Sequence, residues 1–299
     1  MKTSQKDNPR VSVVIPLFDK AAFIKATLES VLAQTMGDFE VLVVDDSRDE
    51  GPSIARSLGD ERIQVVHYSD RGISAARNHG LSISRSDLVA FLDADDLWQP
   101  RFLETMVDAL ERHAEAVAAF CAFGEGAGGR TRMPRLRGEI VIGDYPAWFI
   151  RRGGRGLWSS NNLVRKAALQ QAGLFPEGVR NGEDTDTWFR LSFEGPVLYV
   201  PELLARYVPD EAGSANKKAG PQEPFVIRSI QAALGSGKLG ASSRASALAA
   251  IDYFRIAYAS ALAMRGRRKE ALAAARSARF RPRLWRAFAR AIVAYALGR

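Results

Sequence analysis

The chain has 299 residues, 46% of them hydrophobic and 25% charged, which is the composition of a folded globular protein and excludes a disordered, fibrous or low-complexity chain. Its single cysteine, Cys121, excludes an intramolecular disulfide and a cysteine zinc cluster. The polar start and the lack of about 20 consecutive apolar residues predict neither a secretory signal nor a membrane-spanning helix. Together these features favour a cytoplasmic protein.

The first half of the chain alternates apolar runs with stretches of helical spacing. Buried strands that alternate with helices predict an α/β fold with a parallel sheet covered on both faces. Ligands of such sheets bind beyond the carboxyl ends of the strands. The predicted strands are 11–16, 40–46, 63–67, 88–96 and 116–123, and helices are expected at 20–35 and 74–84.

The second half is less regular and ends in a basic, alanine-rich stretch. Residues 221–299 hold 15 basic and 3 acidic residues, a balance of +12 within a total of +8, so the remaining residues carry −4. Such asymmetry concerns surface partners rather than the fold. The expected elements are a loop at 124–139, helices near 163–172 and 185–193, a strand at 197–200, a loop at 209–224 and helices over 225–299, with 245–280 as one helix pair of the tetratricopeptide type.

The strongest chemical signal is Asp93-Ala94-Asp95-Asp96, which follows a strand. Three carboxylates within four residues repel one another, and a divalent cation relieves that repulsion. Mg²⁺ and Mn²⁺ take oxygen ligands, often one or two carboxylates together with phosphate oxygens. An acidic cap on the following helix is an equal alternative.

Three further segments carry weaker signals of the same site. Asp45 and Asp46 end a strand, where a carboxylate can contact a nucleotide base or ribose, although an ordinary turn also explains them. Arg77 lies on a helix of small residues and can pair with phosphate, or the small residues simply pack that helix on the sheet. Glu183 and Asp184 precede a helix and offer a general base or an acidic helix start.

Several other functions are disfavoured by what the sequence lacks. It contains no GxxxxGK[ST] phosphate loop, no GxGxxG after a strand, no GxSxG and no HExxH. Its three histidines are scattered, which argues against a histidine metal site. The basic tail has no recognisable nucleic-acid fold motif and the body is acidic, so nucleic acid is not an expected partner.

Taken in order, these segments resemble those of a family 2 glycosyltransferase of the GT-A fold. The resemblance covers about residues 11–207 and rests on VSVVIPLFDK, SVLAQTMGDFEVLVVDDSRDEG, DRGISAARNHGL, LVAFLDADDLWQP and GEDTDTWFRL. It implies a mainly parallel sheet flanked by helices. It also implies transfer of a sugar from a nucleotide diphosphate, usually with inversion and with Mn²⁺ or Mg²⁺ as cofactor.

The resemblance also implies roles for single residues. Asp19 stands where the family often has Asn, and after Tyr207 the stretch Val208-Pro209-Asp210 replaces a common Arg-x-His, for which Arg206 or Lys217 could substitute. Arg190 matches the helix that follows the Glu-Asp motif. The implied sites are Pro16, Phe18, Asp45, Asp46, Arg77, Asn78, Asp93 and Trp188 for the nucleotide sugar, Asp95 and Asp93 for the metal, and Asp184, with Glu183, for catalysis.

We therefore expect a lead at 1–10, a GT-A domain at 11–220 and a basic helical extension at 221–299. The expected reaction transfers a sugar, most often from a UDP donor, to a saccharide or lipid-linked acceptor during synthesis of a bacterial surface polysaccharide or glycolipid. The alternative is a catalytically impaired, sugar-nucleotide-binding or scaffolding member. Residues 279–299 form an amphipathic, arginine-rich pattern that favours peripheral contact with the inner face of the plasma membrane, with packing on protein as the alternative.

Overall fold

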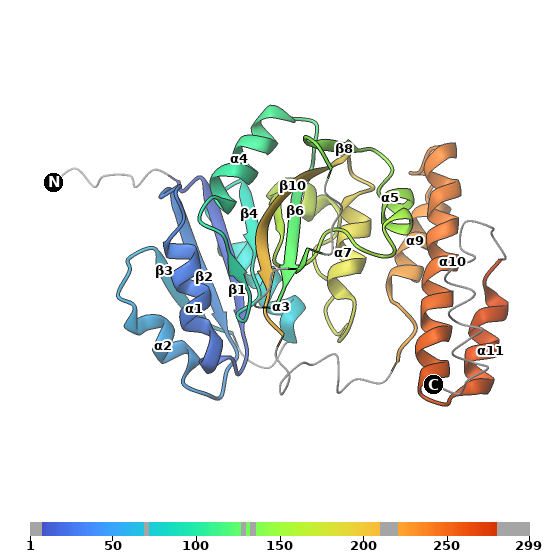
Figure 1. Ribbon diagram of the computed structural model, residues 1–299, viewed down its shortest axis with the longest axis horizontal. Coiled ribbons are helices and arrows are strands. Elements are labelled where there is room, and N and C mark those ends of the chain that lie inside the picture. Colours follow the sequence, from blue (N-terminus) through green and yellow to red (C-terminus); the bar gives the residue numbers. More distant parts are fainter. Residues whose placement is uncertain (1–7, 69–71, 127–129, 132–135, 210–220, 280–299) are drawn as a thin grey trace.

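The computed structural model describes residues 8–68, 72–126, 130–131, 136–209 and 221–279. Within them a mixed sheet of ten strands has helices on both faces, and the C-terminal helices stand at one end (Figure 1). The strands are β1 Val11–Leu17, β2 Phe39–Asp45, β3 Ile63–His67, β4 Leu88–Phe91, β5 Leu97–Trp98, β6 Ala118–Glu125, β7 Arg130–Thr131, β8 Ile140–Ile142, β9 Asn162–Arg165 and β10 Val197–Tyr207. The helices are α1 Ala21–Leu32, α2 Gly51–Ser57, α3 Gly72–Ile83, α4 Phe102–Arg112, α5 Tyr145–Arg151, α6 Lys166–Gln171, α7 Glu183–Leu191, α9 Val226–Gly235, α10 Ala241–Met264 and α11 Arg268–Ser277.

The order of the strands places the sequence-predicted acidic segments at one edge. The main path is β3-β2-β1-β4-β9-β6-β10-β5, with β7 beside β6 and β8 beside β10. The neighbours β3, β2, β1 and β4 are all parallel. Their carboxyl ends therefore meet along the same edge, and the loops that follow β1, β2 and β4 lie next to one another.

Three details of the architecture differ from what the residue patterns predicted. The alternation of strands and helices predicted a parallel sheet, whereas the sheet is mixed, because β9 runs antiparallel to β4 and β6. The helix expected near 163–172 begins only at Lys166, since Asn162–Arg165 form β9. Leu163 and Val164 are too short an apolar run for periodicity to separate a strand from a helix, so the pairing partners decide. The short β7 likewise lies inside the loop expected at 124–139.

The alternating side chains of the strands feed two cores, one on each face of the sheet. Val14 of β1 points into one core, whereas Val13 and Ile15 point into the other. Helices α1, α2 and α4 cover the second core, while α3, α5, α6 and α7 cover the first. The small-residue face of α3 packs closely on the sheet: a Cβ at Gly80 would lie 2.4 Å from Val14 Cγ1.

Helix α9 and the first half of α10 extend the first core, whereas α10 and α11 pack on each other in a small separate cluster of Leu262, Ala263 and Ala271. Val226, Ile230 and Phe254 belong to the same apolar cluster as Trp188 of α7. Helix α9 packs beside α7, α10 packs beside α5, and α11 lies on the outer side of α10 (Figure 1). The helical extension is thus present, but it is not independent of the sheet domain. One segment of α10, Ser243–Met264, is long and apolar enough to cross a membrane by length and composition, yet half of it is buried within the fold, as in a packed core helix.

Candidate functional site: a carboxylate-lined edge held by one buried arginine

The nucleotide side of the predicted site begins where β1 and β2 end. Pro16 is buried within β1, and Phe18 just beyond it is 56% exposed at the edge of the sheet. Asp45 ends β2 and is buried; its Oδ1 accepts the Ser47 backbone N–H at 2.9 Å, and its Oδ2 lies 3.5 Å from His67 Nδ1. The Asp46 backbone N–H donates to Leu17 O at 2.9 Å, which ties the two loops together.

Asp19 shows why an acidic residue can stand where asparagine is common. Its φ is +49°, in the left-handed region that Asn and Asp enter more readily than other side chains. Its Oδ1 accepts the Arg48 backbone N–H at 2.9 Å, and its own N–H donates to Ser47 Oγ at 3.3 Å. An aspartate meets both backbone requirements, so this departure from the family pattern is structurally mild.

The turn after β4 presents two carboxylates to solvent. The side chains of Asp93 and Asp95 are 25% and 18% exposed. Asp95 Oδ2 accepts from Lys20 Nζ at 2.6 Å, and Asp93 Oδ1 accepts from Arg77 Nη2 at 2.8 Å. Burial raises the pKa of Asp95, an effect that the ion pair with Lys20 opposes. Each of these two partly exposed carboxylates therefore forms an ion pair with a basic side chain.

The third carboxylate of this turn has a different task. Asp96 is buried, and its two oxygens accept from Ser160 Oγ at 2.6 Å and from the Val208 backbone N–H at 3.1 Å. Burial, with the charges of Asp93 and Asp95, raises its pKa well above the usual range. Asp96 therefore connects the turn to the segment before β9 and to the end of β10. The partly exposed carboxylates of the turn are Asp93 and Asp95.

Arg77 connects the acidic turn to the start of α7. The side chain is 1% exposed; Nη2 donates to Asp93 Oδ1 and to Ser159 Oγ at 2.9 Å, while Nη1 donates to Glu183 Oε1 at 3.0 Å. Its guanidinium also lies 5.2 Å from the Phe175 ring centroid. Burial alone would lower the pKa of Arg77, but the charges of Asp93 and Glu183 outweigh burial and raise it. Arg77 lies within this network rather than on an open surface, so it positions the two carboxylates.

The start of α7 holds the predicted base. Gly182 precedes the helix with φ +77°, a conformation that suits glycine. Asp184 is partly buried, and its Oδ1 accepts the Thr185 backbone N–H at 2.6 Å. Among the described residues no lysine, arginine or histidine forms an ion pair with it. Burial and the neighbouring Glu183 raise the pKa of Asp184 to about 6, although Arg77 acts in the opposite direction.

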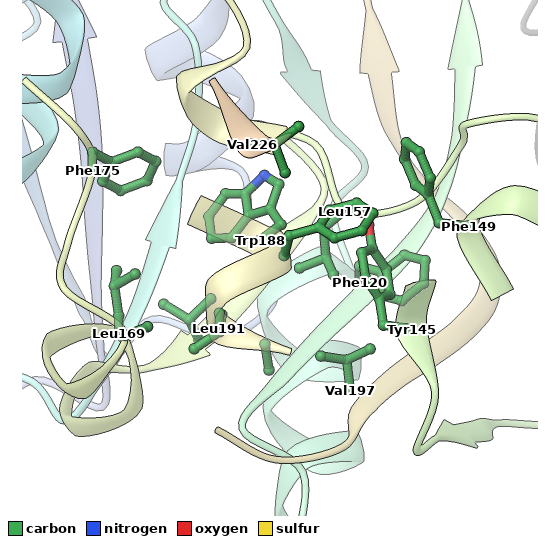
Figure 2. Close-up of a cluster of buried hydrophobic side chains, with 14 of the residues drawn as sticks. Phe120, Tyr145, Phe149, Leu157, Leu169, Phe175, Trp188, Leu191, Val197 and Val226 are labelled. Carbon is green, nitrogen blue, oxygen red and sulfur yellow. The ribbon is translucent and has the colours of Figure 1, made fainter. Parts of the chain in front are cut away.

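Two of the residues predicted to contact the nucleotide sugar support the site from behind. Trp188 is completely buried, packed with Phe91 and Phe175, and Figure 2 shows it inside the apolar cluster beneath α7. Asn78 donates to Phe175 O at 2.9 Å and accepts from Phe175 N–H at 2.9 Å. Both side chains contact Phe175 and therefore hold the segment before α7 in place.

The predicted Arg190 likewise anchors local structure. Its Nε donates to Asp186 Oδ2 at 2.8 Å, and its Nη2 donates to Leu174 O at 2.6 Å. As Asp96 does in the first acidic cluster, Asp186 serves as the structural carboxylate of the second. The Arg190 and Asn78 contacts together hold residues 174–175 against α3 and α7.

Sequence reasoning missed Lys20, Ser159 and Ser160. Ser160 Oγ accepts the Asp93 backbone N–H at 3.1 Å and donates to Asp96, and Ser159 contacts Arg77. The run Ser159-Ser160-Asn161-Asn162 is wholly buried. The sequence signal for these residues was the run of four polar residues directly before the apolar pair of β9. Buried polar groups are generally hydrogen-bonded, so such a run beside a strand indicates a buried polar network.

The residues after Tyr207 stand where the family pattern predicts an Arg-x-His contact with the diphosphate or metal. The Val208 backbone N–H is used by Asp96, and Arg206 Nε donates to Gly126 O at 3.0 Å. Asp210 and Lys217 lie outside the described residues. Arg206, one of the two expected substitutes, is therefore already engaged by the backbone of the β6 end.

Comparisons with known proteins identify the family of the chain. The family model for glycosyl transferase family 2 matches residues 12–173, more than half of the chain. The glycosyltransferase EpsJ of Bacillus subtilis is 29% identical over 59% of this chain and 54% of its own length. A glycosyltransferase of Rickettsia bellii is 30% identical over 61% of this chain and 26% of its own length. The chain thus spans at most about half the length of these curated relatives.

Solved structures show the same fold. Staphylococcus aureus TarS in complex with UDP-GlcNAc superposes with a TM-score of 0.68 at 17% identity, covering 97% of this chain and 90% of that one. The mannosyltransferase PcManGT of Pyrobaculum calidifontis, in complex with GDP-Man and Mn²⁺, gives 0.60 at 21% identity, covering 98% and 87%. The expected GT-A fold with C-terminal helices is confirmed. With its acidic motifs at the carboxyl ends of a GT-A sheet and a family model over most of that sheet, the chain belongs to glycosyl transferase family 2.

Proposed function

We propose that the protein is an inverting glycosyltransferase that uses a nucleotide-diphosphate sugar, with UDP as the expected nucleotide. The acceptor would be a hydroxyl of a saccharide or lipid-linked intermediate in the synthesis of a bacterial surface polysaccharide or glycolipid. The observation that carries the proposal is the double ion pair of Arg77, which holds the donor-side carboxylate Asp93 and the Glu183-Asp184 pair in one network.

The chemistry follows from the unequal surroundings of the carboxylates. An acceptor hydroxyl has a pKa far above 7 and needs a nearby base in the transition state. Asp184 has no cation partner among the described residues, and its pKa is raised to about 6, so it is ionised at neutral pH yet more basic than an ordinary aspartate. Attack from the face opposite the leaving diphosphate would invert the anomeric centre.

The residues fit a divalent cation that binds together with the donor. Asp95 already accepts a cationic ammonium at 2.6 Å, and Asp93 keeps Oδ2 without a hydrogen bond to described residues. In the described part of the chain no three His, Cys, Asp or Glu side chains gather to hold a metal alone. Asp95 and Asp93 would therefore bind Mn²⁺ or Mg²⁺ with phosphate oxygens. When bound, the ion would stabilise the charge of the departing diphosphate.

The comparisons support this donor class without deciding the nucleotide. TarS is described with UDP-GlcNAc, and PcManGT with GDP-Man and Mn²⁺. A cytoplasmic location, with the C-terminal helices meeting the inner face of the plasma membrane, remains part of the proposal. The arginine-rich pattern of 279–299 that motivates membrane contact lies almost wholly outside the described residues.

A panel of UDP-, dTDP- and GDP-sugars with and without Mn²⁺ tests the proposal by thermal unfolding. A donor present at 100 times its Kd stabilises the native state by about 2.7 kcal/mol. We expect metal-dependent stabilisation that Asp95→Asn abolishes and that the exposed control Asp38→Asn retains. If no nucleotide sugar stabilises the wild type, or if Asp95→Asn responds like the control, the donor and metal assignments are wrong.

The replacement of Arg-x-His by Val208-Pro209-Asp210 supports a second candidate. A member with a weakened diphosphate site would bind sugar nucleotides but turn them over poorly, and would act by binding or scaffolding. Metal-dependent hydrolysis of the stabilising donor separates the two. Donor hydrolysis by the wild type that is lost in Asp95→Asn supports the enzyme. Donor binding without any hydrolysis or transfer supports the impaired member.

A further inference from the structure

Six arginines gather where the end of α5 meets the C-terminal helices. The first three come from the end of α5 and the turn that follows it, the fourth from α10, and the last two from the end of α11. They are Arg151, Arg152, Arg155, Arg255, Arg276 and Arg279, here called the arginine surface.

Contacts in the described structure bring these segments together. Ile150 of α5 and Ala278 after α11 both pack against Ile256 of α10. Arg255 Nη1 donates to Ser277 O at 2.7 Å. Gly154 has φ +83° and packs so closely on α10 that a Cβ there would lie 2.4 Å from the Tyr253 hydroxyl. The turn that carries Arg155 is therefore seated directly on the helix that carries Arg255.

The arginine surface keeps most of its charge uncompensated. Arg151, Arg155, Arg276 and Arg279 are exposed, and none of the six forms an ion pair with an Asp or Glu in the described residues. The acidic group beneath them, Asp252, is 3% exposed and accepts the Arg279 backbone N–H at 3.0 Å. Guanidinium groups prefer planar oxyanions such as phosphate and carboxylate, which they bind through paired hydrogen bonds.

This surface continues into the segment that forms the site. Arg155 is four residues before Ser159, whose hydroxyl contacts Arg77. Four extended residues reach about 14 Å at most, so the surface begins within that distance of the network that holds Glu183 and Asp184. A chain bound along the arginines would need to extend about 14 Å or less beyond Arg155 to reach Ser159.

We propose that the arginine surface binds an acceptor that carries phosphate groups. This inference rests on the proposed function, because it names the class of acceptor that meets Asp184. Interfacial surfaces that bind a bilayer insert apolar side chains beside the charged ones. The exposed large apolar residues in the described structure are Phe18, Ile73, Val141 and Leu203 in the sheet domain, Leu248 and Met264 on α10, and Leu272 on α11, one turn before Arg276. A bilayer is therefore the competing occupant that the test must separate.

The test uses inorganic polyphosphate as the probe, titrated by calorimetry into the full-length protein with EDTA present. The variant Arg151→Gln/Arg155→Gln/Arg279→Gln removes three charges from the surface. The control Arg56→Gln/Arg137→Gln/Arg228→Gln removes three exposed charges from segments outside the arginine surface. We expect polyphosphate to bind the first variant about tenfold or more weakly than the wild type, because charge-assisted contacts are lost. The control should stay within about twofold, and added salt should weaken the wild type most.

Three controls separate this inference from its competitors. Nucleotide-sugar stabilisation with Mn²⁺ should be unchanged in the surface variant, which shows that the donor site is intact. Equal polyphosphate binding by both triple variants overturns the inference. Loss of binding to phosphatidylglycerol vesicles without loss of polyphosphate binding also overturns it and assigns the surface to a membrane. If no variant binds a nucleotide sugar, the proposed function fails, and the acceptor assignment falls with it even where polyphosphate binding depends on the arginines.

Discussion

Two acidic clusters of almost the same composition differ in how the protein compensates their charges. Asp93, Asp95 and Asp96 follow β4, while Glu183, Asp184 and Asp186 begin α7, so each cluster has three carboxylates within four residues. In each, one completely buried carboxylate serves the fold: Asp96 binds Ser160 and Val208, and Asp186 binds Arg190.

The difference lies in how the remaining charges are compensated. In the first cluster both exposed carboxylates are paired with cations, Asp93 with Arg77 and Asp95 with Lys20. In the second, Arg77 pairs with Glu183, and the donors to Asp184 are the backbone N–H and the hydroxyl of Thr185. The paired cluster is suited to hold positive charge, and the under-compensated one is suited to accept a proton. Local composition does not distinguish them, whereas the placement of two basic side chains does.

The largest effect is expected for Asp184→Asn, which tests whether the second cluster holds the base. We expect transfer to the acceptor to fall by about 10²–10⁴-fold, the usual contribution of a general base, while nucleotide-sugar binding is retained. Measurement of kcat beside donor Kd separates the two effects. Glu183→Gln is the neighbouring control and should reduce kcat less. Collapse of donor binding in Asp184→Asn would show that Asp184 is structural or a metal neighbour.

Arg77→Met tests whether one arginine joins the two clusters. Removing one partner of a buried ion pair leaves uncompensated charge, so the free energy of unfolding should fall by about 3–5 kcal/mol. Chemical denaturation measures this loss. Arg77→Lys keeps the charge but cannot fork to both Asp93 and Glu183, so it should recover part of the stability and little of the transfer rate. A stable, fully active Met variant is the outcome that contradicts the joining role.

The acidic limb of kcat/KM sharpens the assignment of the base. Because burial raises the pKa of Asp184 to about 6, the carboxylate is protonated progressively as the pH falls through that value. We expect kcat/KM to be level above the pKa and to decrease about tenfold per pH unit below it. Since Arg77 lowers this pKa, Arg77→Lys should shift the limb less than Arg77→Met, which should move it to higher pH. A profile without a limb between pH 5 and 7, a window of about one unit on either side, would exclude Asp184 as the base.

Lys20→Gln tests the cation that sits on the first cluster. Without its ammonium, Asp95 would bind Mn²⁺ more tightly in the absence of nucleotide, by up to about fivefold if the pair contributes about 1 kcal/mol. A Mn²⁺ titration followed by electron paramagnetic resonance measures this directly. Lys25→Gln is the control, because Lys25 lies on α1, which begins just after Lys20, and pairs with Glu29 at 3.9 Å. Unchanged or weaker Mn²⁺ affinity would show that Lys20 does not compete with the metal.

The smallest effect is expected for Trp188→Phe. The indole Nε1 is buried without a hydrogen-bond partner, so the substitution loses packing but no hydrogen bond and should cost about 1–2 kcal/mol of stability. Donor affinity should stay within about twofold, because the ring lies in the core. Phe18→Ala, at the exposed edge, should weaken donor binding more. The reverse order would restore Trp188 as a donor contact.

Much of the fold could be predicted because its signals are local. The apolar runs of β1, β2, β3 and β4 and the helical spacing between them identify the doubly covered half of the sheet, and the confirmed family follows from the order of the motifs. β9 could not be predicted, since its short apolar pair becomes a strand only beside β4 and β6. The extension was predicted as helical, but its sharing of one core with Trp188 depends on packing that no local pattern encodes.

The sequence by itself determined which residue types follow the strands at the candidate site, with Asp45 and Asp93 each at the carboxyl end of a predicted strand. Only the tertiary structure decided what each carboxylate does. Arg77 lies 106 residues from Glu183, and Ser160 lies 64 from Asp96, so these pairings are contacts of the folded chain. Burial and charge pairing set the pKa and the accessibility of a side chain, and both are properties of its neighbours in space rather than in sequence.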